Sequence, residues 1–284
     1  MTVADTGNEK AARRVLVTGG ARGLGRAVAM ALAASGHDVV FTYNASSNNA
    51  ESTLEELRDA FPDNRFEARA VDLSDRGAID ALVDELDEEE PFYGLVHNAG
   101  MTYDSLAAVM DQDRAEAAMQ VNFWSLTRLA SGVVRRMTRA RNGRIVMIGS
   151  VIALRGSIGN AAYAASKSAL LGYMRTLALE TAKRGVTVNY IAPGFIDTDM
   201  LAPYADYREH MESQIPIGRF AAAAEIAGVV DFLMSPAAGY ITGAVVPVDG
   251  GLTAAIPVHR RPAPPPQPNA RAHPPSPNTL RPSP

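Results

Sequence analysis

One stretch decides the fold of this 284-residue chain: Val15-Leu16-Val17-Thr18-Gly19-Gly20-Ala21-Arg22-Gly23-Leu24-Gly25. It begins as an apolar run of strand character, passes through closely spaced glycines, and continues into a run rich in Ala, Val and Leu that predicts a helix. Glycines here let the backbone turn tightly and approach a pyrophosphate, and the start of the following helix offers free N–H groups. The stretch therefore predicts the first β-α-β unit of a nucleotide-binding α/β fold.

Outside this stretch, strand-like runs alternate with helical patterns at β-α-β spacing. The expected strands span residues 15–18, 39–43, 65–71, 94–97, 144–148, 187–191 and 244–248. The expected helices span residues 24–34, 50–60, 75–86, 112–139, 162–183 and 224–234. Short Val/Ile runs between amphipathic helices indicate a parallel sheet covered on both faces. We therefore expect an α/β fold with a doubly wound, parallel seven-stranded sheet in a single domain over residues 14–252.

The ends of the chain differ from this body. Residues 1–13 are expected to form a flexible N-terminus, and residues 253–284 a proline-rich disordered tail, because eleven of the eighteen prolines lie from Pro257 onward. A PxxP ligand within the tail is the alternative interpretation. Residues 195–220 break the strand–helix alternation and are interpreted as a substrate lid.

Bulk composition excludes several classes of function. The net charge is −4 and the pI is about 5.8, which gives no reason to expect a nucleic-acid partner. The chain has no cysteine, so thiol nucleophiles and thiolate metal sites are excluded, and we expect no metal. The acidic run at residues 84–90 is interpreted as a solvated helix end. No membrane partner is expected, because no apolar leader or membrane-length run is found, and a cytoplasmic location is expected.

The end of the second expected strand bears on cofactor choice. An acid there accepts the ribose 2′-OH of NAD, but the chain reads Phe41-Thr42-Tyr43-Asn44-Ala45-Ser46. Arg22 adds a cation in the glycine loop. Both features favour the 2′-phosphate of NADPH, with an ordinary surface arginine as the alternative for Arg22.

A second constellation lies in the middle of the chain. Tyr163 and Lys167 stand four residues apart, on one face of an expected helix, and Ser150 ends an expected strand. A cation held beside a phenol favours the phenolate, so we expect Lys167 to lower the pKa of Tyr163 from about 10 toward the range of general acid–base catalysis. Ser150 could share a carbonyl oxygen with Tyr163. Alone, such a Tyr/Lys pair is more often a helix face with a long lysine.

Taken together, these motifs resemble the short-chain dehydrogenase/reductase family. They fall in family order: the glycine loop, Asn98-Ala99-Gly100, Asn122, Ser150, Tyr163, Lys167 and Pro193-Gly194. The resemblance covers residues 14–252 and implies a Rossmann-type fold. Within the family, the segments at residues 143–150, 160–167 and 192–200 are similar to those of 3-oxoacyl-[acyl-carrier-protein] reductases. Departures are His97, to which we assign no role, Tyr93-Gly94, and the tail.

The resemblance also implies roles for individual residues. The catalytic residues would be Asn122, Ser150, Tyr163 and Lys167. The NADPH contacts would be Gly19, Arg22, Gly23, Leu24, Gly25, Asn44, Ser46, Asp72, Leu73, Asn98, Ala99, Gly100, Tyr163, Lys167, Pro193, Gly194 and Ile196. Asn122 would position a water chain that reprotonates through Lys167. Arg141 and Arg184 would dock an acyl carrier protein.

The implied activity is NADPH-dependent reduction of a 3-oxoacyl thioester to the (3R)-hydroxyacyl thioester, in fatty-acid or polyketide-like elongation. A reductase of a sugar, steroid or small alcohol or ketone is the nearer alternative, and a non-catalytic NADPH-binding partner subunit the more distant one. A homotetramer or homodimer is expected, because the helix at residues 162–183 is apolar on several sides. Burial inside the monomer by the helix at residues 112–139 would explain the same pattern.

Overall fold

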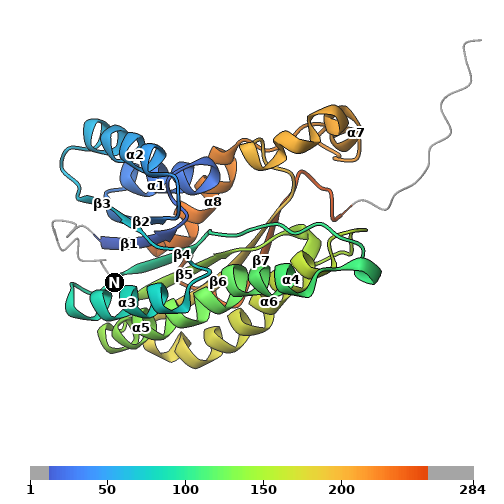
Figure 1. The fold of residues 1–284 in the computed structure, drawn as a ribbon. Coiled ribbons are helices and arrows are strands. Elements are labelled where there is room, and N and C mark those ends of the chain that lie inside the picture. The colour runs from blue at the N-terminus through green and yellow to red at the C-terminus, as the bar shows by residue number, and fades with distance from the viewer. Residues whose placement is uncertain (1–12, 255–284) are drawn as a thin grey trace, which may run out of the picture. The chain divides into compact units, whose positions relative to one another are not determined.

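Seven parallel strands form one sheet in the computed structural model, which describes residues 13–254 (Figure 1). The strands are β1 (Arg13–Thr18), β2 (His37–Tyr43), β3 (Phe66–Ala70), β4 (Gly94–His97), β5 (Gly143–Ile148), β6 (Val186–Pro193) and β7 (Val245–Val248). Their order across the sheet is β3-β2-β1-β4-β5-β6-β7. This confirms the predicted doubly wound parallel sheet, since the chain moves outward from β1 in one direction and from β4 in the other.

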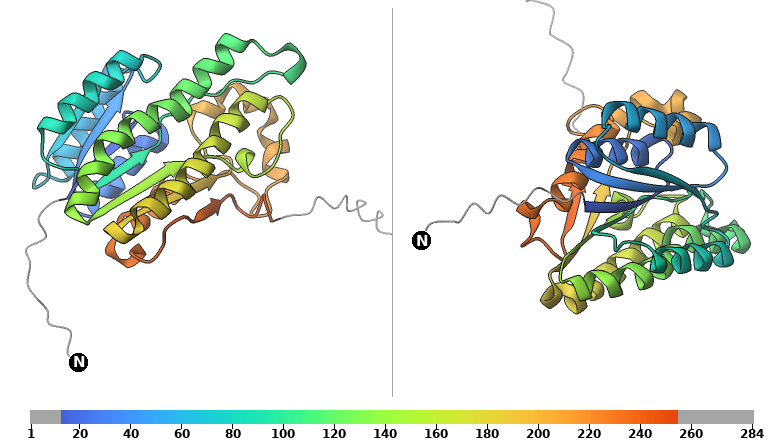
Figure 2. Two further views of the ribbon diagram at one scale, coloured as in Figure 1. Left: turned by 90° about the horizontal axis from the view of Figure 1, so that it is seen from below. Right: turned by 90° about the vertical axis from the view of Figure 1, so that its left-hand side faces the viewer.

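Helices cover both faces of the sheet, as two of the views show (Figures 1 and 2). One face carries α1 (Gly23–Ala34), α2 (Ser47–Ala60) and α8 (Ala223–Met234), and the other carries α3 (Arg76–Glu88), α4 (Gln112–Met119), α5 (Ser125–Ala140) and α6 (Ala161–Thr181). Alternate side chains of β1 pack into the two helix layers. Val15 and Val17 belong to the core under α1 and α8, and Leu16 belongs to the core under α3, α5 and α6.

The predicted single helix at residues 112–139 is interrupted. A π-helical segment, Gln120–Trp124, separates α4 from α5. It contains Asn122, which is fully buried and hydrogen-bonded on both sides of its amide. Helical periodicity could not reveal the extra residue, because the apolar spacing on either side remains that of an α-helix.

Helix α6 is buried mostly within its own chain. Leu170, Met174 and Leu177 lie in the core, and Tyr173 packs edge-on against Phe123 of the π-helical segment, with ring centroids 6.0 Å apart. Leu179 is 83% exposed. Intramolecular burial therefore explains most of the apolar character of this helix but not all of it.

The connection from β6 to α8 departs from the α/β alternation, as expected. It holds the 3₁₀ segment η5 (Asp199–Tyr207) and the short helix α7 (Arg208–Ser213). Arg208 pairs with Asp197, at 2.9 Å, and lies over the Phe220 ring, so the two ends of the segment are braced together.

Short 3₁₀ turns complete the described part: η1 (Ala107–Val109), η3 (Val151–Ala153), η4 (Ala182–Arg184) and η6 (Pro236–Ala238). The described residues belong to a compact unit that ends at Ala254. The expected flexible N-terminus, except Arg13, and the expected proline-rich tail from residue 255 lie outside the described residues. No helix of the described part is long and apolar enough to cross a membrane.

Candidate active site

Nearly all of the residues selected from the sequence meet at one edge of the sheet. Gly19 follows β1, Asn44 follows β2, Asn98 follows β4, Ser150 follows β5 and Gly194 follows β6. Because all seven strands are parallel, their carboxyl ends share this edge. Ligands of doubly wound sheets bind at this position, and the helix N-termini there add N–H donors.

The glycine loop has the shape that its sequence requires. Gly19 has a φ of +69°, and an added Cβ on it would lie 3.1 Å from Ala99 Cα. At Gly25 an added Cβ would lie 2.0 Å from the carbonyl oxygen of Gly19, so only glycine lets α1 begin this close to the loop. The side chain of Asn98 donates to the carbonyl oxygens of Thr18 and Gly19, both at 3.0 Å. The loop is therefore preformed as a cradle for a pyrophosphate.

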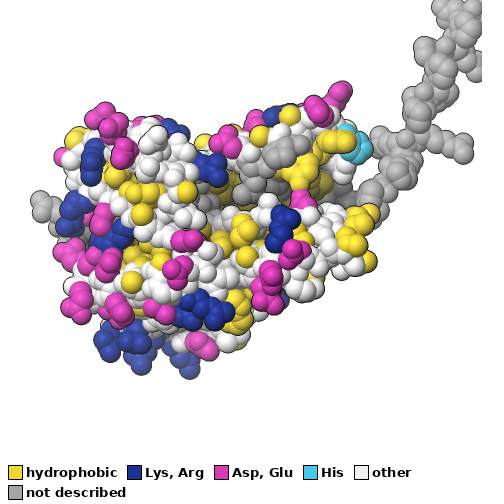
Figure 3. Space-filling view, in the orientation of Figure 1, with side chains coloured by type: hydrophobic (Ala, Val, Ile, Leu, Met, Phe, Trp, Pro, Cys, Tyr) yellow, Lys and Arg dark blue, Asp and Glu magenta, His cyan; other side chains and the backbone are white. Residues whose placement is uncertain are grey.

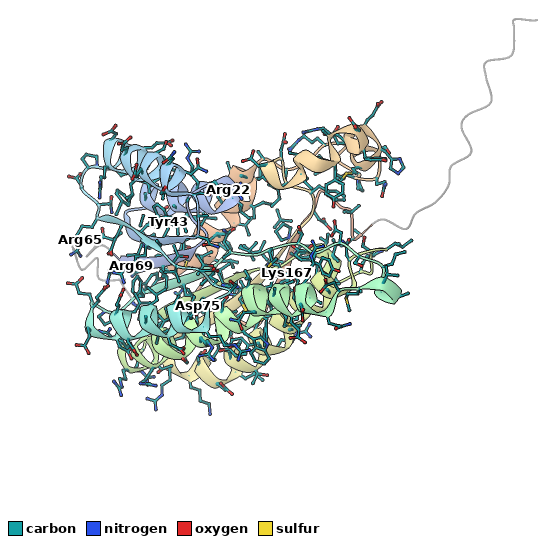
Figure 4. All side chains as sticks on the ribbon, viewed as in Figure 1. Arg22, Tyr43, Arg65, Arg69, Asp75 and Lys167 are labelled. Atoms are coloured by element: carbon teal, nitrogen blue, oxygen red, sulfur yellow. The ribbon has the colours of Figure 1, made fainter. Side chains whose placement is uncertain are left out.

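The 2′ side of the site is polar and carries no acid. Asn44 and Ser46 follow β2, and Asn44 is exposed, as is Arg22 at the start of α1. Arg22 and Tyr43 lie on the same side of the sheet edge, whereas Lys167 comes from the opposite helix layer (Figure 4). This arrangement fits the phosphorylated ribose of NADPH better than the free diol of NADH.

Beyond β3, Asp72 and Leu73 behave differently from each other. Leu73 is buried, and Asp72 is exposed, with its carboxylate accepting hydrogen bonds from the amide and hydroxyl of Ser74, at 2.8 and 2.7 Å. The carboxylate therefore shapes the turn that follows β3. Further along the edge, Ile196 pairs with Ala221 in a short parallel bridge that anchors the start of the lid.

Asn122 holds the loop after β4 against α6. Its amide donates to the carbonyl of Met101 at 3.0 Å and to Ser166 Oγ at 2.8 Å, and its carbonyl accepts from the Met101 amide at 2.8 Å. Lys167 Nζ lies close by, since an added Cβ on Gly100 would be 3.0 Å from Nζ and 3.2 Å from Asn122 Oδ1. The structure thus brings the predicted Asn122, Gly100 and Lys167 together.

Lys167 is buried, and its ammonium donates a 3.0 Å hydrogen bond to the carbonyl oxygen of Ile148. Its Nζ lies 5.9 Å from the centroid of the Tyr163 ring. Burial lowers the pKa of Lys167 to about 8. The amine therefore changes charge near physiological pH, which an exposed lysine does not.

The expected direction of the Tyr163 pKa shift is wrong in this structure. Desolvation by the surrounding protein raises the pKa of Tyr163 to about 12, a hydrogen bond with Ser150 lowers it, and the Asp104 carboxylate raises it further. The charge on Lys167 is not among these causes. The cost of removing a phenolate from water dominates, although Lys167 Nζ lies 5.9 Å from the ring centroid, so Tyr163 keeps its proton at neutral pH.

At the entrance of the site, Asp104 connects the lid to two other segments. Asp104 was not among the residues predicted from the sequence. Its carboxylate accepts from Asn160 Nδ2 at 2.6 Å and from the hydroxyl of Tyr204 in η5. Large exposed side chains lie on the segments that this contact joins: Leu106, Val109, Ile158, Tyr204 and Tyr207. Hydrophobic side chains are visible both on the lid and on the body below it (Figure 3). The entrance therefore offers apolar surface.

Thr198 is a second residue that sequence reasoning missed. Its Cγ2 would lie 3.7 Å from a Cβ on Gly23, so the base of the lid rests against the glycine loop. In the sequence it lies within the segment at residues 192–200 that carries the family resemblance, but no role was assigned to it.

His97 is a structural link, which agrees with its receiving no catalytic role. It is fully buried, with Nε2 3.1 Å from the carbonyl oxygen of Asn122 and Nδ1 3.2 Å from Thr18 Oγ1. A carbonyl only accepts, so Nε2 carries the hydrogen and Nδ1 accepts from the threonine. Burial, together with the Lys167 charge, lowers the pKa of His97 to about 3, so the ring stays neutral.

Arg141 and Arg184 lie together but away from the catalytic residues. Arg141 donates to the carbonyl oxygen of Lys183 at 3.1 Å, next to Arg184. Arg141 precedes β5 and Arg184 precedes β6, so both lie at the amino ends of strands whose carboxyl ends carry Ser150 and Gly194. The six residues of β5 span about 20 Å between the two edges.

Within residues 13–254, no group of three or more His, Asp or Glu side chains is placed to hold a metal ion. In the acidic run at residues 84–90, Glu89 pairs with Arg14 at 2.6 Å and with Arg69 at 2.5 Å. Glu89 is therefore partly buried and neutralised by arginines, whereas the other acids of the run, Asp84, Glu85, Asp87, Glu88 and Glu90, are exposed, as expected of a solvated helix end.

Comparison with known proteins places the whole described body in one group of sequences. The profile of a family described as enoyl-(acyl carrier protein) reductase matches residues 19–253. The chain is 42% identical to the 3-oxoacyl-[acyl-carrier-protein] reductase FabG of Pseudomonas aeruginosa over 242 residues, covering 84% of this chain and 96% of that protein. It is 40% identical to FabG of Escherichia coli, with the same coverage, and 39% identical to the reductase MabA of Mycobacterium tuberculosis, covering 84% of this chain and 92% of that protein.

Solved structures give the same fold. A blue fluorescent protein from a metagenomic library, in complex with NADPH, is 34% identical and superposes with a TM-score of 0.79, covering 84% of this chain and 97% of its own. An NAD(P)-dependent gluconate 5-dehydrogenase, described as putative, from Beutenbergia cavernae with bound NADP is 34% identical with a TM-score of 0.81, covering 86% of this chain and 97% of its own.

Proposed function

Because the chain belongs to the short-chain dehydrogenase/reductase family, we propose that it is an NADPH-dependent 3-oxoacyl-[acyl-carrier-protein] reductase. The observation that carries the proposal is the assembly of Ser150, Tyr163 and Lys167 beside the glycine loop, in a chain 39–42% identical to three reductases of that name. The product would be the (3R)-hydroxyacyl thioester, in fatty-acid or polyketide-like elongation.

The residues present fit NADPH. Gly25 lets α1 begin against the carbonyl oxygen of Gly19, Arg22 supplies a cation, and no acid directly follows β2. NADPH, when bound, supplies a hydride to C3 of the acyl group. Asp72, Leu73, Asn98, Ala99 and Gly100 would line its adenosine side, and Pro193, Gly194 and Ile196 its nicotinamide side.

The chain's own residues handle the proton. Tyr163 is protonated at neutral pH because its pKa is about 12, and it donates to the alkoxide that develops at C3. Ser150 hydrogen-bonds the same oxygen and stabilises the growing charge. Lys167 then stabilises the phenolate that remains, and Asn122 holds the Met101 loop against α6 so that these groups keep their spacing.

The proposal includes docking of the acyl carrier protein at Arg141 and Arg184. Arg141 and Arg184 lie at the opposite edge of the sheet from Ser150. A prosthetic arm that starts at these arginines would have to span at least the length of β5, about 20 Å, to reach Ser150 of the same subunit. The proposal includes a homodimer or homotetramer, for which the exposed Trp124 (48%) and Leu179 (83%), on the π-helical segment and α6, and Phe232 (45%) on α8 offer apolar surface. Light scattering during size-exclusion chromatography measures the assembly.

A reductase of a small alcohol, ketone or sugar is the second candidate. It is favoured by the similarity, at 34% identity, to a structure described as a gluconate 5-dehydrogenase. The deciding experiment follows NADPH absorbance with three substrates: a 3-oxoacyl-carrier protein, the same acyl group on a short thiol, and 5-ketogluconate. Preference for the carrier-bound substrate supports the proposal. Preference for the sugar acid overturns it, and NADPH binding without turnover of any substrate would identify a non-catalytic subunit.

A further inference from the structure

Tyr190 stands out among the buried side chains because its hydroxyl reaches two catalytic segments at once. It lies in the middle of β6 and has no exposed surface. The amide of Ser150 donates to its hydroxyl oxygen at 3.0 Å. The same hydroxyl lies 3.3 Å from the carbonyl oxygen of Lys167 and 3.4 Å from that of Ser150.

These contacts use both the acceptor oxygen and the donor hydrogen of the phenol. Its oxygen accepts the Ser150 amide, and its single hydrogen is shared between the carbonyls of Lys167 and Ser150. Burial raises the pKa of Tyr190 well above its ordinary value, so the hydroxyl keeps its hydrogen at every working pH. Without this hydroxyl, the Ser150 amide would be buried with no acceptor, which costs free energy.

The surrounding backbone is built around the ring. An added Cβ on Gly149 would lie 1.7 Å from Tyr190 Cζ, so a side chain at residue 149 would displace the phenol. Ser150 itself is extended, with φ −164°, and its Oγ accepts the Ile152 amide at 3.2 Å. The Tyr190 hydroxyl on one side and the η3 turn on the other therefore fix the backbone of Ser150.

The second contact sets the position of the helix that carries the proton donor. The carbonyl of Lys167 belongs to the turn of α6 that follows Tyr163. At its side-chain end, Lys167 is tied to Ile148 at the end of β5. One phenol thus links β6, the loop that carries Ser150, and the helix that carries Tyr163 and Lys167.

We propose that Tyr190 is a positioning residue for ketone reduction, whose hydroxyl sets the placement of Ser150 relative to Tyr163 and Lys167. This inference rests on the proposed reductase activity but not on the identity of the acyl group or its carrier. Small displacements of catalytic groups are costly in rate, so loss of the hydroxyl acts on turnover even though Tyr190 touches no substrate.

The test is Tyr190→Phe, with Tyr93→Phe as its matched control. Tyr93 is also buried, and its hydroxyl donates to the carbonyl oxygen of Met234 at 2.7 Å, in the other helix layer. Both variants keep the ring and lose the hydroxyl, but Tyr190→Phe also leaves the Ser150 amide without its acceptor, so we expect its melting temperature to fall at least as far as that of Tyr93→Phe. In Tyr190→Phe alone, we expect kcat to fall about tenfold or more, with the Kd for NADPH changed less than about twofold.

A double variant separates positioning from general destabilisation. In the Ser150→Ala background, Tyr190→Phe should lower kcat by less than about threefold, because the group that it positions is already gone. An equal loss in both backgrounds, or a kcat for Tyr190→Phe within about twofold of wild type, overturns the proposal.

Hydrogen exchange gives a readout that does not need activity. Amides at residues 149–153 should exchange hydrogen faster in Tyr190→Phe than in the wild type. In Tyr93→Phe they should exchange at the wild-type rate. The kinetic assay uses whichever ketone the wild type reduces. A wild type that reduces no ketone refutes the proposed function, and unchanged exchange at residues 149–153 refutes the role of Tyr190.

Discussion

Lys167 donates its ammonium hydrogen bond to the main-chain oxygen of Ile148 at 3.0 Å, two residues before Ser150. The contact ties the catalytic helix α6 to the carboxyl end of β5. Burial in the protein removes the amine from water, which lowers the pKa of Lys167 to about 8. Lys167 therefore combines a structural contact with a charge that titrates close to working pH.

The first prediction concerns the pH dependence of kcat/KM, which reports the free enzyme. Lys167 carries its charge below pH 8 and loses it above, so the phenolate left by Tyr163 loses its stabilising cation as pH rises. We expect kcat/KM for ketone reduction to decline through about pH 8. A profile that stays flat up to pH 10 in a stable protein would contradict this role of Lys167.

The second prediction tests the proton donor. Tyr163→Phe should keep NADPH affinity and lower turnover by about two orders of magnitude or more, because general-acid transfer is lost. Tyr173→Phe is the control, since Tyr173 lies on the same helix, packs against Phe123 and is not part of the catalytic set. Fluorescence titration measures binding, and NADPH absorbance measures turnover. Near-normal turnover in Tyr163→Phe would remove Tyr163 from the mechanism.

The third prediction concerns cofactor choice. Asn44→Asp places a carboxylate after β2, where it accepts the ribose hydroxyls of NADH and repels a 2′-phosphate. We expect the ratio of kcat/KM for NADPH to that for NADH to fall by about tenfold or more, the scale of one charged hydrogen bond. Asn64→Asp adds the same charge just before β3, at the amino ends of the strands and away from the cofactor side. It should leave the ratio unchanged. If both variants behave alike, the end of β2 does not select the cofactor.

The fourth prediction addresses carrier docking. Changing both Arg141 and Arg184 to Glu should raise KM for a carrier-bound substrate and leave KM for a small ketone unchanged, because only the acidic carrier would feel the reversed charge. Arg58→Glu, on the exposed end of α2, is the charge control. The effect should weaken as salt is added. Equal changes in KM for both substrates would argue against docking at this pair.

The fifth prediction follows from His97. Its pKa is about 3 in the folded chain and about 6.5 when unfolded, so between these values the unfolded state binds the extra proton. The contribution of neutral His97 to the free energy of unfolding is complete above about pH 6.5. It is lost as the pH falls below that value, by up to about 1.4 kcal/mol per pH unit. Denaturant unfolding between pH 4.5 and 6.5 measures it. His97→Asn should flatten the slope and the exposed His210→Asn should not; equal slopes in all three proteins would contradict the assignment.

Much of this architecture was predictable from the chain itself. Val15-Leu16-Val17 alternates between two apolar layers, Gly19 has a positive φ, and a Cβ on Gly25 would meet the carbonyl oxygen of Gly19 six residues earlier, so the first β-α-β unit follows from local rules. Parallel strands then bring their carboxyl ends together, which is why Asn98, Ser150 and Gly194 could be placed at one edge before any coordinates. The roles of Tyr163 and Lys167 came from spacing and family resemblance.

Other features could not be predicted, because they depend on what surrounds a group in space. At the interruption of the helix, Asn122 contacts Met101 and Ser166, one from another loop and one from another helix. The sign of the Tyr163 pKa shift depends on how much protein excludes water from the phenol, and spacing along a helix carries no such information. Tyr190 looked like any other strand residue.

By itself, then, the order of residues determined the α/β class, the seven strands and the identity of the groups that meet at their carboxyl ends, because backbone propensity, apolar periodicity and glycine geometry act over a few neighbouring residues. Tertiary structure alone decided the charge states of Tyr163, Lys167 and His97 and the contact of Arg141 with the carbonyl oxygen of Lys183. Solvent exclusion and long-range packing set those properties, and both arise only when distant segments come together.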